Sequence, residues 1–162
     1  PVNVPGEIQV KGANVFLGYF KNEEATAEVL TEDGWFRTGD MGVLDSEGSL
    51  FIKGRTKCMI LGPSGQNIYP EEVETVINSQ PYVVDSLVVE DNGGLTALIY
   101  PDFAQGAKDG MKQEAFVKYM EDTLPELNKE LPNYAKLKKI EVMSEDFERT
   151  PKKSIKRYLY QR

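Results

Sequence analysis

The sequence contains no histidine, and Cys58 is its only cysteine. A chain without histidine cannot build a Ser-His-Asp triad, a Cys-His pair or the common zinc sites. A single cysteine forms no internal disulfide and no thiolate metal cluster. Any catalytic chemistry in this chain therefore has to use lysine, arginine or carboxylate side chains, and we expect no metal site within it.

Long hydrophobic runs are absent as well. No apolar stretch approaches the roughly 20 residues that cross a bilayer, and no signal-peptide pattern opens the chain, so we expect a cytoplasmic protein. The 162 residues suffice for one domain or one and a half, with a real core. Because the chain begins at Pro1 without a methionine, we expect it to be a piece of a longer protein.

The formal charge of -7 is distributed unevenly along the chain. Residues 133–162 hold nine Lys/Arg and four Asp/Glu, a local charge of +5, so the remainder carries -12. Such an end is typical of a solvated basic helix or of an anion-binding surface. Few exposed aromatics are interleaved with these basic residues, and the acidic remainder would repel a polyanion. We therefore expect a small phosphate ligand and no nucleic acid.

A hairpin pattern occupies the middle of the first third of the chain. Residues 41–45 and 49–53 alternate apolar and polar side chains around a Glu-Gly turn, which would bring Asp40 and Arg55 close together. An ionised Asp accepts hydrogen bonds from a vicinal diol such as that of ribose. Arg donates to ribose or phosphate oxygens, so the pair indicates a nucleotide site.

Two shorter elements precede the hairpin. Residues 7–11 alternate at period two and predict a strand whose partner lies outside this chain. Residues 22–30 predict a helix with Asn22 as its N-cap and acids in its first turn. At Lys57, strands and turns change to alternating helices and strands. We therefore place a domain boundary there, between a β-rich part over residues 1–56 and a second part over residues 57–162.

The second part is predicted to be a small α+β domain with a sheet of about three strands. Its expected elements are a loop over residues 62–69, helices over 70–78, 111–124 and 154–160, and strands over 82–90, 95–100 and 137–143. Pro125 either kinks the middle helix or starts a successor behind Thr123, which forms a capping-box pattern with Glu126. In the last helix, Ile155 and Leu159 are expected to face inward.

Motifs along nearly the whole chain resemble, in order, the signature motifs of the adenylate-forming acyl-CoA synthetases. In those enzymes the motifs close the large N-terminal domain and open a small, mobile C-terminal domain. In this sequence they occupy residues 6–12, 18–20, 34–40, 54–57, 62–74 and 150–157. The Gly-Gln-Asn-Ile-Tyr-Pro loop over residues 65–70 looks most like the long-chain fatty acid branch of that family.

The resemblance implies an ATP-dependent long-chain fatty acid–CoA ligase, which forms an acyl-adenylate and pyrophosphate and then transfers the acyl group to coenzyme A. It implies that Asp40 and Arg55 bind ATP or AMP and that Lys57 is the hinge. The loop that lines the pantetheine channel would comprise Gly62, Ser64, Gly65, Gln66 and Asn67. Magnesium would accompany ATP, with its ligands outside this piece. The piece alone would be inactive, because the acyl pocket belongs to the N-terminal domain.

The sequence departs from the family at the lysine that serves adenylation. The family pattern is Thr-Pro, two residues and then lysine, and an ungapped match places Ser154 there, which carries no positive charge. Three interpretations stay open: Lys153 acts from one position earlier, Lys156 acts from two positions later, or the enzyme is weakened in adenylation. We expect Lys153, because a loop residue reorients more easily than a residue of the final helix.

The substrate and the class of protein each have an alternative. The whole enzyme could adenylate another acid, such as acetate, an aryl acid or an amino acid loaded onto a carrier protein. A non-catalytic interaction module is the second class, and the paired Asp40 and Arg55 argue against it. For the whole enzyme we expect fatty acid, ATP and CoA as substrates and its own N-terminal domain as partner, and we leave peripheral membrane association open.

Overall fold

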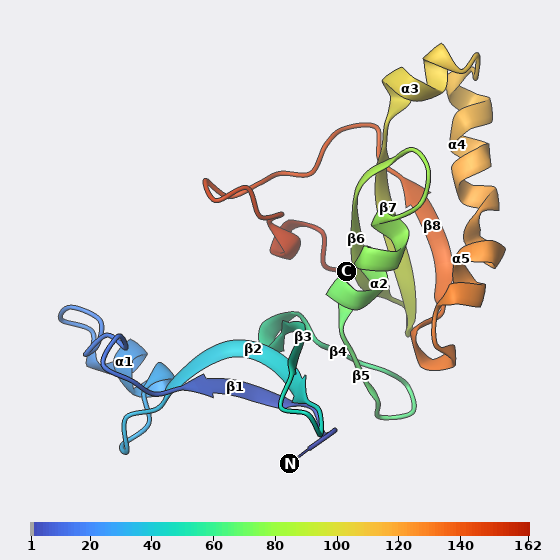
Figure 1. Ribbon diagram of the computed structural model, residues 1–162. Helices are drawn as coiled ribbons and strands as arrows, with labels where there is room; N and C mark the ends of the chain where they lie inside the picture. The colour runs from blue at the N-terminus through green and yellow to red at the C-terminus, as the bar shows by residue number, and fades with distance from the viewer. Residues whose placement is uncertain (1) are drawn as a thin grey trace. The chain divides into compact units, whose positions relative to one another are not determined.

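The computed structural model describes residues 2–162, and the chain divides into two compact units, Pro1–Met59 and Ile60–Arg162 (Figure 1). Both units contain small sheets and helices, which confirms the α+β class predicted from the sequence. The division falls after Met59, and the boundary at Lys57 itself stays a prediction. In the described residues, no helix has the length and the apolar character that a membrane span requires.

The first unit is a three-stranded antiparallel sheet with one short helix. It comprises β1 (Gly6–Val10), α1 (Glu23–Val29), β2 (Phe36–Leu44), β3 (Leu50–Arg55) and the 3-10 helix η1 (Thr56–Cys58), with the strands in the order β1-β2-β3. The predicted hairpin is β2 and β3. Its turn is closed by the Asp45 carboxylate, which accepts the amides of Glu47 at 2.9 Å and Ser49 at 2.8 Å.

The prediction that the first strand pairs outside this chain is wrong. Strand β1 pairs antiparallel with β2, with Glu7 opposite Met41 and Val10 opposite Phe36. A period-two pattern identifies a strand but does not name its neighbour, and here helix α1 and its loops separate the two strands in sequence. The helix itself is confirmed, because the Asn22 side chain accepts the amide of Ala25 at 3.0 Å as an N-cap.

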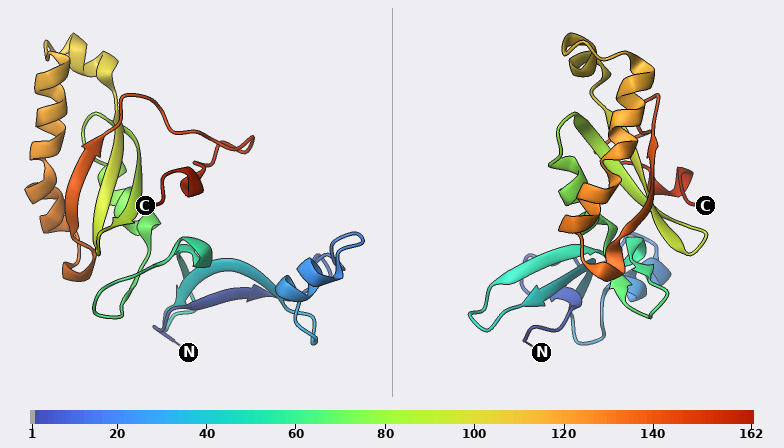
Figure 2. Two further views of the ribbon diagram at one scale, coloured as in Figure 1. Left: turned by 180° about the vertical axis from the view of Figure 1, so that it is seen from behind. Right: turned by 90° about the vertical axis from the view of Figure 1, so that its right-hand side faces the viewer.

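The second unit is built on the sheet β6-β7-β8 (Figures 1 and 2). Its elements are β4 (Ile60–Leu61), β5 (Asn67–Ile68), α2 (Pro70–Asn78), β6 (Val83–Asp91), β7 (Gly94–Pro101), α3 (Phe103–Lys108), α4 (Gln113–Asp122), α5 (Leu124–Glu130), η2 (Asn133–Ala135), β8 (Leu137–Val142) and η3 (Arg157–Leu159). Strands β6 and β7 are antiparallel, whereas β7 and β8 are parallel. The parallel pair needs a long crossover, and helices α3, α4 and α5 supply it.

Helices cover one face of this sheet. Ile77 of α2 and Phe116 and Met120 of α4 are buried in one cluster with Val88 of β6 and Ala97 of β7. Val88 and Ala97 lie opposite each other in the ladder, so their side chains point to the same face. This cluster is the main core of the second unit, and it packs α2 and α4 against β6 and β7.

The C-terminal segment covers the opposite face of the sheet (Figure 2). Leu87 and Leu98, which alternate with the residues of the main core, are buried there against Phe147. Ile155 and Tyr160 pack onto the same cluster, and the Phe147 and Tyr160 rings meet edge to face at 5.3 Å between centroids. The basic end of the chain is therefore packed on the sheet through its apolar residues.

Two local predictions in the second unit are corrected. Helix α5 does follow α4 as a successor, but Thr123 forms no capping box: its hydroxyl donates to the Met120 carbonyl at 2.6 Å instead. The helix predicted over residues 154–160 is reduced to the 3-10 turn η3. Ile155 faces inward as expected, whereas Leu159 is 48% exposed.

Arg162 binds the end of the chain to the sheet. It donates to Glu141 of β8 through both guanidinium ends and to Asp91 at 3.1 Å. Arg162 and Lys139 together lower the pKa of Glu141 from its ordinary value of 4.5 to about 2. The charged form of Glu141 thus stabilises the fold above pH 4.5, and this stabilisation is lost as the pH falls toward 2.

We expect Glu141→Gln to lower the stability of the chain by about 1 kcal/mol at pH 7, a value reduced by solvent screening of a partly exposed pair. Thermal unfolding of both forms at pH 7 and near pH 2 measures the difference, which should disappear at the lower pH. Glu145→Gln, at an exposed position, is the matched control. An equal loss at both pH values would contradict an electrostatic role for Glu141.

Candidate functional site

The first candidate site is the Asp40 and Arg55 pair in the first unit. The two residues lie opposite each other where β2 meets β3, and Arg55 Nε donates to Asp40 Oδ1 at 3.0 Å. The Thr38 hydroxyl accepts the Asp40 amide at 3.0 Å and donates to the Ile8 carbonyl at 2.8 Å, which fixes the Asp40 backbone to β1. The structure therefore brings together the two residues that the hairpin pattern paired.

This pair is open to solvent and able to exchange partners. The Asp40 and Arg55 side chains are 34% and 62% exposed, and the second Asp40 oxygen accepts no hydrogen bond from residues 2–162. An exposed ion pair contributes about 0 to 1 kcal/mol, so a ligand replaces it at small cost. The carboxylate can thus accept hydrogen bonds from two hydroxyl groups while the guanidinium donates to an anionic oxygen.

The predicted hinge residue Lys57 lies in η1 and is exposed. The Met59 amide donates a long hydrogen bond, 3.4 Å, to the Thr56 carbonyl at the end of that short turn. Lys57 precedes the division between the two units by two residues. Its position and exposure are those that a hinge requires, and the role stays a prediction.

The predicted channel loop is a tight hairpin between β4 and β5 in the second unit. The Gly62 amide donates to the Gln66 carbonyl and the Gly65 amide donates to the Gly62 carbonyl, both at 2.8 Å. Gly65 has φ of +79°, which favours glycine, and a side chain at Gly62 would lie 3.1 Å from Ile68. Ser64, Gln66 and Asn67 are exposed along its edge.

A cavity of about 420 Å³ lies beside this loop, entirely within the second unit. The loop lines one wall with Gly62 and Gln66, the β6-β7 turn contributes Gly94, and the segment before β8 contributes Tyr134 and Lys136. The lining combines apolar residues with polar side chains, among them one cation, Lys136, and one carboxylate, Glu90. Such a groove suits an extended ligand with both methylene and amide groups.

Lys152 and Lys153 of the C-terminal motif lie on a turn over residues 150–154, and Lys156 lies beyond it, directly before η3. The Lys153 amide donates to the Thr150 carbonyl and the Thr150 amide donates to the Ser154 carbonyl, both at 2.8 Å. The channel loop has the same pattern, with proline second and a left-handed residue fourth. That fourth position holds Gly65 in the loop and Lys153, with φ of +64°, in this turn.

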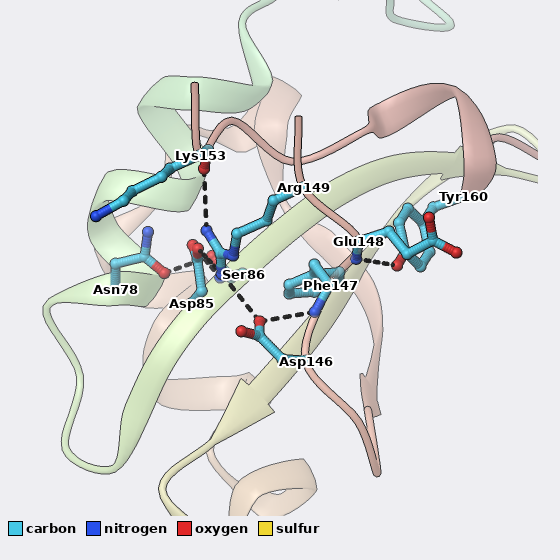
Figure 3. Close-up of polar contacts among 9 residues, drawn as sticks. All are labelled: Asn78, Asp85, Ser86, Asp146, Phe147, Glu148, Arg149, Lys153 and Tyr160. Carbon is cyan, nitrogen blue, oxygen red and sulfur yellow. Dashed lines mark hydrogen bonds and ion pairs between the residues drawn. The ribbon is translucent and has the colours of Figure 1, made fainter. Parts of the chain in front are cut away.

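A lysine in a position that favours glycine costs about 1 to 3 kcal/mol, which the surrounding contacts must supply. Lys153 is exposed, and its amino group has no hydrogen-bond or ion-pair partner among residues 2–162. In the view of Figure 3, the Lys153 side chain extends away from Arg149, on the side of Asn78, and no dashed line ends on its amino group. Lys153 therefore presents a free cation at the tip of the turn.

Lys156 is differently placed. Its amino group lies 3.0 Å from Glu148 Oε2, and its amide donates to the Glu148 carbonyl at 2.8 Å. The hydrogen bond to Glu148 raises the pKa of Lys156. Ser154, at the position of the family lysine, is exposed and forms the far side of the turn. Of the two candidate lysines, Lys153 is the one whose charge is not already paired.

Sequence reasoning did not find the groups that anchor this turn. Arg149 pairs with Asp85, 64 positions earlier, and Arg157 pairs with the buried Glu74 of α2. Glu74 also accepts the Val88 amide at 2.7 Å; burial raises its pKa, and Arg157 opposes that effect. No periodic pattern connects residues so far apart. A glutamate on the apolar stripe of α2 was the one signal available.

No three His, Cys, Asp or Glu side chains of the described residues gather closely enough to hold a metal ion. The described residues thus offer anion-binding and diol-binding groups, and no ligand set for magnesium.

Known proteins resemble this chain over both units. The profile of the AMP-binding enzyme C-terminal domain matches residues 59–162. A 2-succinylbenzoate–CoA ligase of Bacillus cytotoxicus is 49% identical over 89 residues, which are 55% of this chain and 18% of that protein. A long-chain-fatty-acid–CoA ligase of Mycobacterium tuberculosis is 44% identical over 86 residues, which are 53% of this chain and 14% of that protein.

A solved structure extends the similarity to nearly the whole chain. The O-succinylbenzoate coenzyme A synthetase of Bacillus subtilis, in complex with AMP, superposes with a TM-score of 0.75 at 30% identity. The match covers 98% of this chain and 30% of that one. This chain thus spans less than a third of the length of each of these relatives. The chain belongs to the family of AMP-binding enzyme C-terminal domains.

Proposed function

We propose that this chain is the C-terminal part of an ATP-dependent acid–CoA ligase, and that its preferred acid is a long-chain fatty acid. One observation supports the ligase proposal most strongly. The same chain contains the Asp40 and Arg55 pair and a free lysine, Lys153, at the tip of the turn over residues 150–154. The first suits a ribose and the second suits a reacting phosphate. The resemblance of residues 65–70 to the long-chain branch supports the choice of acid.

In the first half-reaction, the carboxylate of the acid attacks the α-phosphorus of ATP and pyrophosphate leaves. Asp40 would accept the ribose hydroxyls and Arg55 would donate to ribose or phosphate oxygens. Lys153 would place positive charge near the carboxylate and the α-phosphate as pentacoordinate phosphorus forms. This is electrostatic stabilisation without proton transfer. ATP is expected to bring magnesium, and no step is assigned to magnesium because the described residues offer it no ligand set.

In the second half-reaction, the thiol of coenzyme A attacks the acyl carbonyl and AMP leaves. The hairpin that holds Gly62, Ser64, Gly65, Gln66 and Asn67 would line the path of the pantetheine arm. Its left-handed Gly65 and crowded Gly62 keep the loop low in bulk, so that an extended chain could lie close to the backbone of the hairpin. Rotation of the backbone at Lys57 would bring the turn and the hairpin into use in succession.

An aryl acid is the second candidate substrate. The 49% identity to the 2-succinylbenzoate–CoA ligase of Bacillus cytotoxicus favours it, and the 44% identity to the fatty acid ligase favours the first candidate. The acyl pocket would belong to the large N-terminal domain, so the Asp40 and Arg55 pair, the hairpin around Gly65 and the lysine turn would serve either acid. We also propose a cytoplasmic location.

Pyrophosphate release by the full-length protein tests this function. We expect release that depends on an added acid, with dodecanoate or hexadecanoate turned over faster than 2-succinylbenzoate, acetate or amino acids. Faster turnover of the aryl acid would favour the second candidate. No acid-dependent release with any of these acids would overturn the proposal.

The 162-residue chain alone should release no pyrophosphate with any acid, because the groups that bind the triphosphate and the acyl chain are expected in the remainder of the enzyme. The measurement is the same assay at matched protein concentration, with the full-length enzyme as control. Acid-dependent turnover by the isolated chain would show that the site is complete within it.

We expect Lys57→Pro to impair one half-reaction more than the other, because proline fixes φ near −65° and restricts the preceding residue as well. Adenylation and transfer from supplied acyl-adenylate are measured separately. Lys57→Ala, which removes the side chain and keeps the torsional freedom, should lose less. Equal losses in both half-reactions of the proline variant would argue against a hinge at Lys57.

A further inference from the structure

Arg149 lies at the centre of the polar cluster beside the lysine turn (Figure 3). Its Nη2 donates to Asp85 Oδ2 and to Asp146 Oδ1, both at 2.9 Å, and its Nη1 donates to the Lys153 carbonyl at 3.4 Å. Asp85 belongs to β6, so a single side chain connects the turn to the sheet. The Arg149 and Asp85 side chains are 30% and 23% exposed, which shields their attraction from solvent.

The two carboxylates that hold Arg149 are themselves fixed. Asp85 accepts the amide of the buried Ser86 at 2.9 Å, and the Ser86 hydroxyl donates to Asn78 of α2 at 2.7 Å. Asp146 accepts the amide of Phe147 at 2.7 Å, and the Phe147 ring is buried against Leu87 and Leu98, on the face of the sheet opposite the main core. Arg149 is thus held by groups that the sheet, α2 and the core keep in place.

We propose that Arg149 is a positioning residue that clamps the turn over residues 150–154 to β6 and so presents Lys153 in one conformation for adenylation. The inference rests on the proposed function. Two observations support the positioning role: Lys153 occupies a strained left-handed position, and Arg149 donates to the carbonyl of that same residue. Arg157, bound to the buried Glu74, anchors the chain on the far side of the turn.

A double-mutant cycle in the full-length enzyme tests whether Arg149 acts through Lys153. We expect Arg149→Met to slow acyl-adenylate formation about tenfold, since a small displacement of a reacting group costs that much or more. In the Lys153→Ala background the same change should have an effect below about twofold, because no lysine remains to be positioned. Arg149→Lys, which keeps the charge, should restore part of the rate. Equal losses in both backgrounds would overturn the proposal.

Trypsin cleavage provides a readout that does not depend on activity. We expect Arg149→Met to accelerate cleavage of the native enzyme after Lys152 and Lys153, as followed by mass spectrometry of the new peptide ends. Arg162→Met is the matched control: it also removes an arginine from an acidic cluster of this unit, but away from the turn. If trypsin cleaves the turn as slowly in Arg149→Met as in Arg162→Met, Arg149 does not hold the turn in place and the proposal is wrong.

The two readouts separate failure of the clamp from failure of the proposed function. If the wild-type enzyme adenylates no acid, both the proposed function and the positioning role of Arg149 in adenylation are wrong. The rate of trypsin cleavage at the turn still decides whether Arg149 holds the turn on β6. If Arg149→Met does not fold, Asp85→Asn replaces it, because that variant keeps the pairing of Arg149 with Asp146. Asp85→Asn is expected to give the same selective loss of adenylation, and a loss of transfer as large as that of adenylation would contradict the proposal.

Discussion

Lys153→Ala in the full-length enzyme is expected to slow acyl-adenylate formation by more than about tenfold, equivalent to over about 1.4 kcal/mol in the barrier. The variant loses the unpaired cation at the tip of the turn, while Lys156 stays bound to Glu148. Thioester formation from supplied acyl-adenylate should persist, because that step would use the hairpin around Gly65. The two half-reactions are measured separately, by pyrophosphate exchange and by release of AMP on addition of coenzyme A.

Two matched variants accompany this test. Lys152→Ala removes the neighbouring exposed lysine of the same turn and should keep adenylation close to the wild-type rate. Lys156→Ala removes the paired lysine. If Lys156→Ala slows adenylation and Lys153→Ala does not, the adenylation lysine is Lys156. If neither Lys153→Ala nor Lys156→Ala slows adenylation, this enzyme adenylates its acid without a lysine in this motif.

Asp40→Ala is expected to weaken ATP binding by about 1.5 to 3 kcal/mol for each ribose hydrogen bond lost, because the acceptor is charged. The fold should survive, since the Asp40 side chain is partly exposed and its ion pair with Arg55 contributes little in water. Equilibrium binding of ATP to the full-length enzyme gives the affinity. Thermal unfolding of the same samples shows whether the variant is folded.

The control for Asp40→Ala is Glu47→Ala, which removes an exposed acid from the turn of the same hairpin. It should bind ATP as the wild type does, and so separates a local contact from a change in net charge. If Asp40→Ala binds ATP with unchanged affinity, Asp40 has only a structural role in the pairing of β2 with β3. The ribose assignment would then fail.

Much of this fold was predictable because its signals are local. The Asn22 cap, the hairpin that pairs Asp40 with Arg55, and Pro70 at the start of α2 each depend on residues a few positions apart. The three strands of the main sheet of the second unit, β6, β7 and β8, followed from apolar runs bounded by turn residues, whereas the short pair β4 and β5 was predicted as a loop. Local patterns were therefore sufficient for the type of most elements.

The rest depended on contacts between distant residues. The partner of β1 could not be named, because a strand pattern is the same whatever strand lies beside it. Residues 154–160 were predicted as a helix from Ile155 and Leu159. Instead, the C-terminal segment follows an irregular path, bound to β6 through Arg149 and to α2 through Arg157. Those two ion pairs connect residues 64 and 83 positions apart, beyond the range of any periodic signal.

Transfer of labelled oxygen tests the central claim most directly. The full-length enzyme is supplied with ATP, coenzyme A and dodecanoate carrying ¹⁸O in its carboxylate, and the products are analysed by mass spectrometry. An acyl-adenylate retains a carboxylate oxygen on its phosphorus, so thiol attack at the carbonyl must release AMP that carries one ¹⁸O. We predict singly labelled AMP in amounts equal to the thioester formed. Label in inorganic phosphate together with ADP, or thioester formation with unlabelled AMP, would contradict the account.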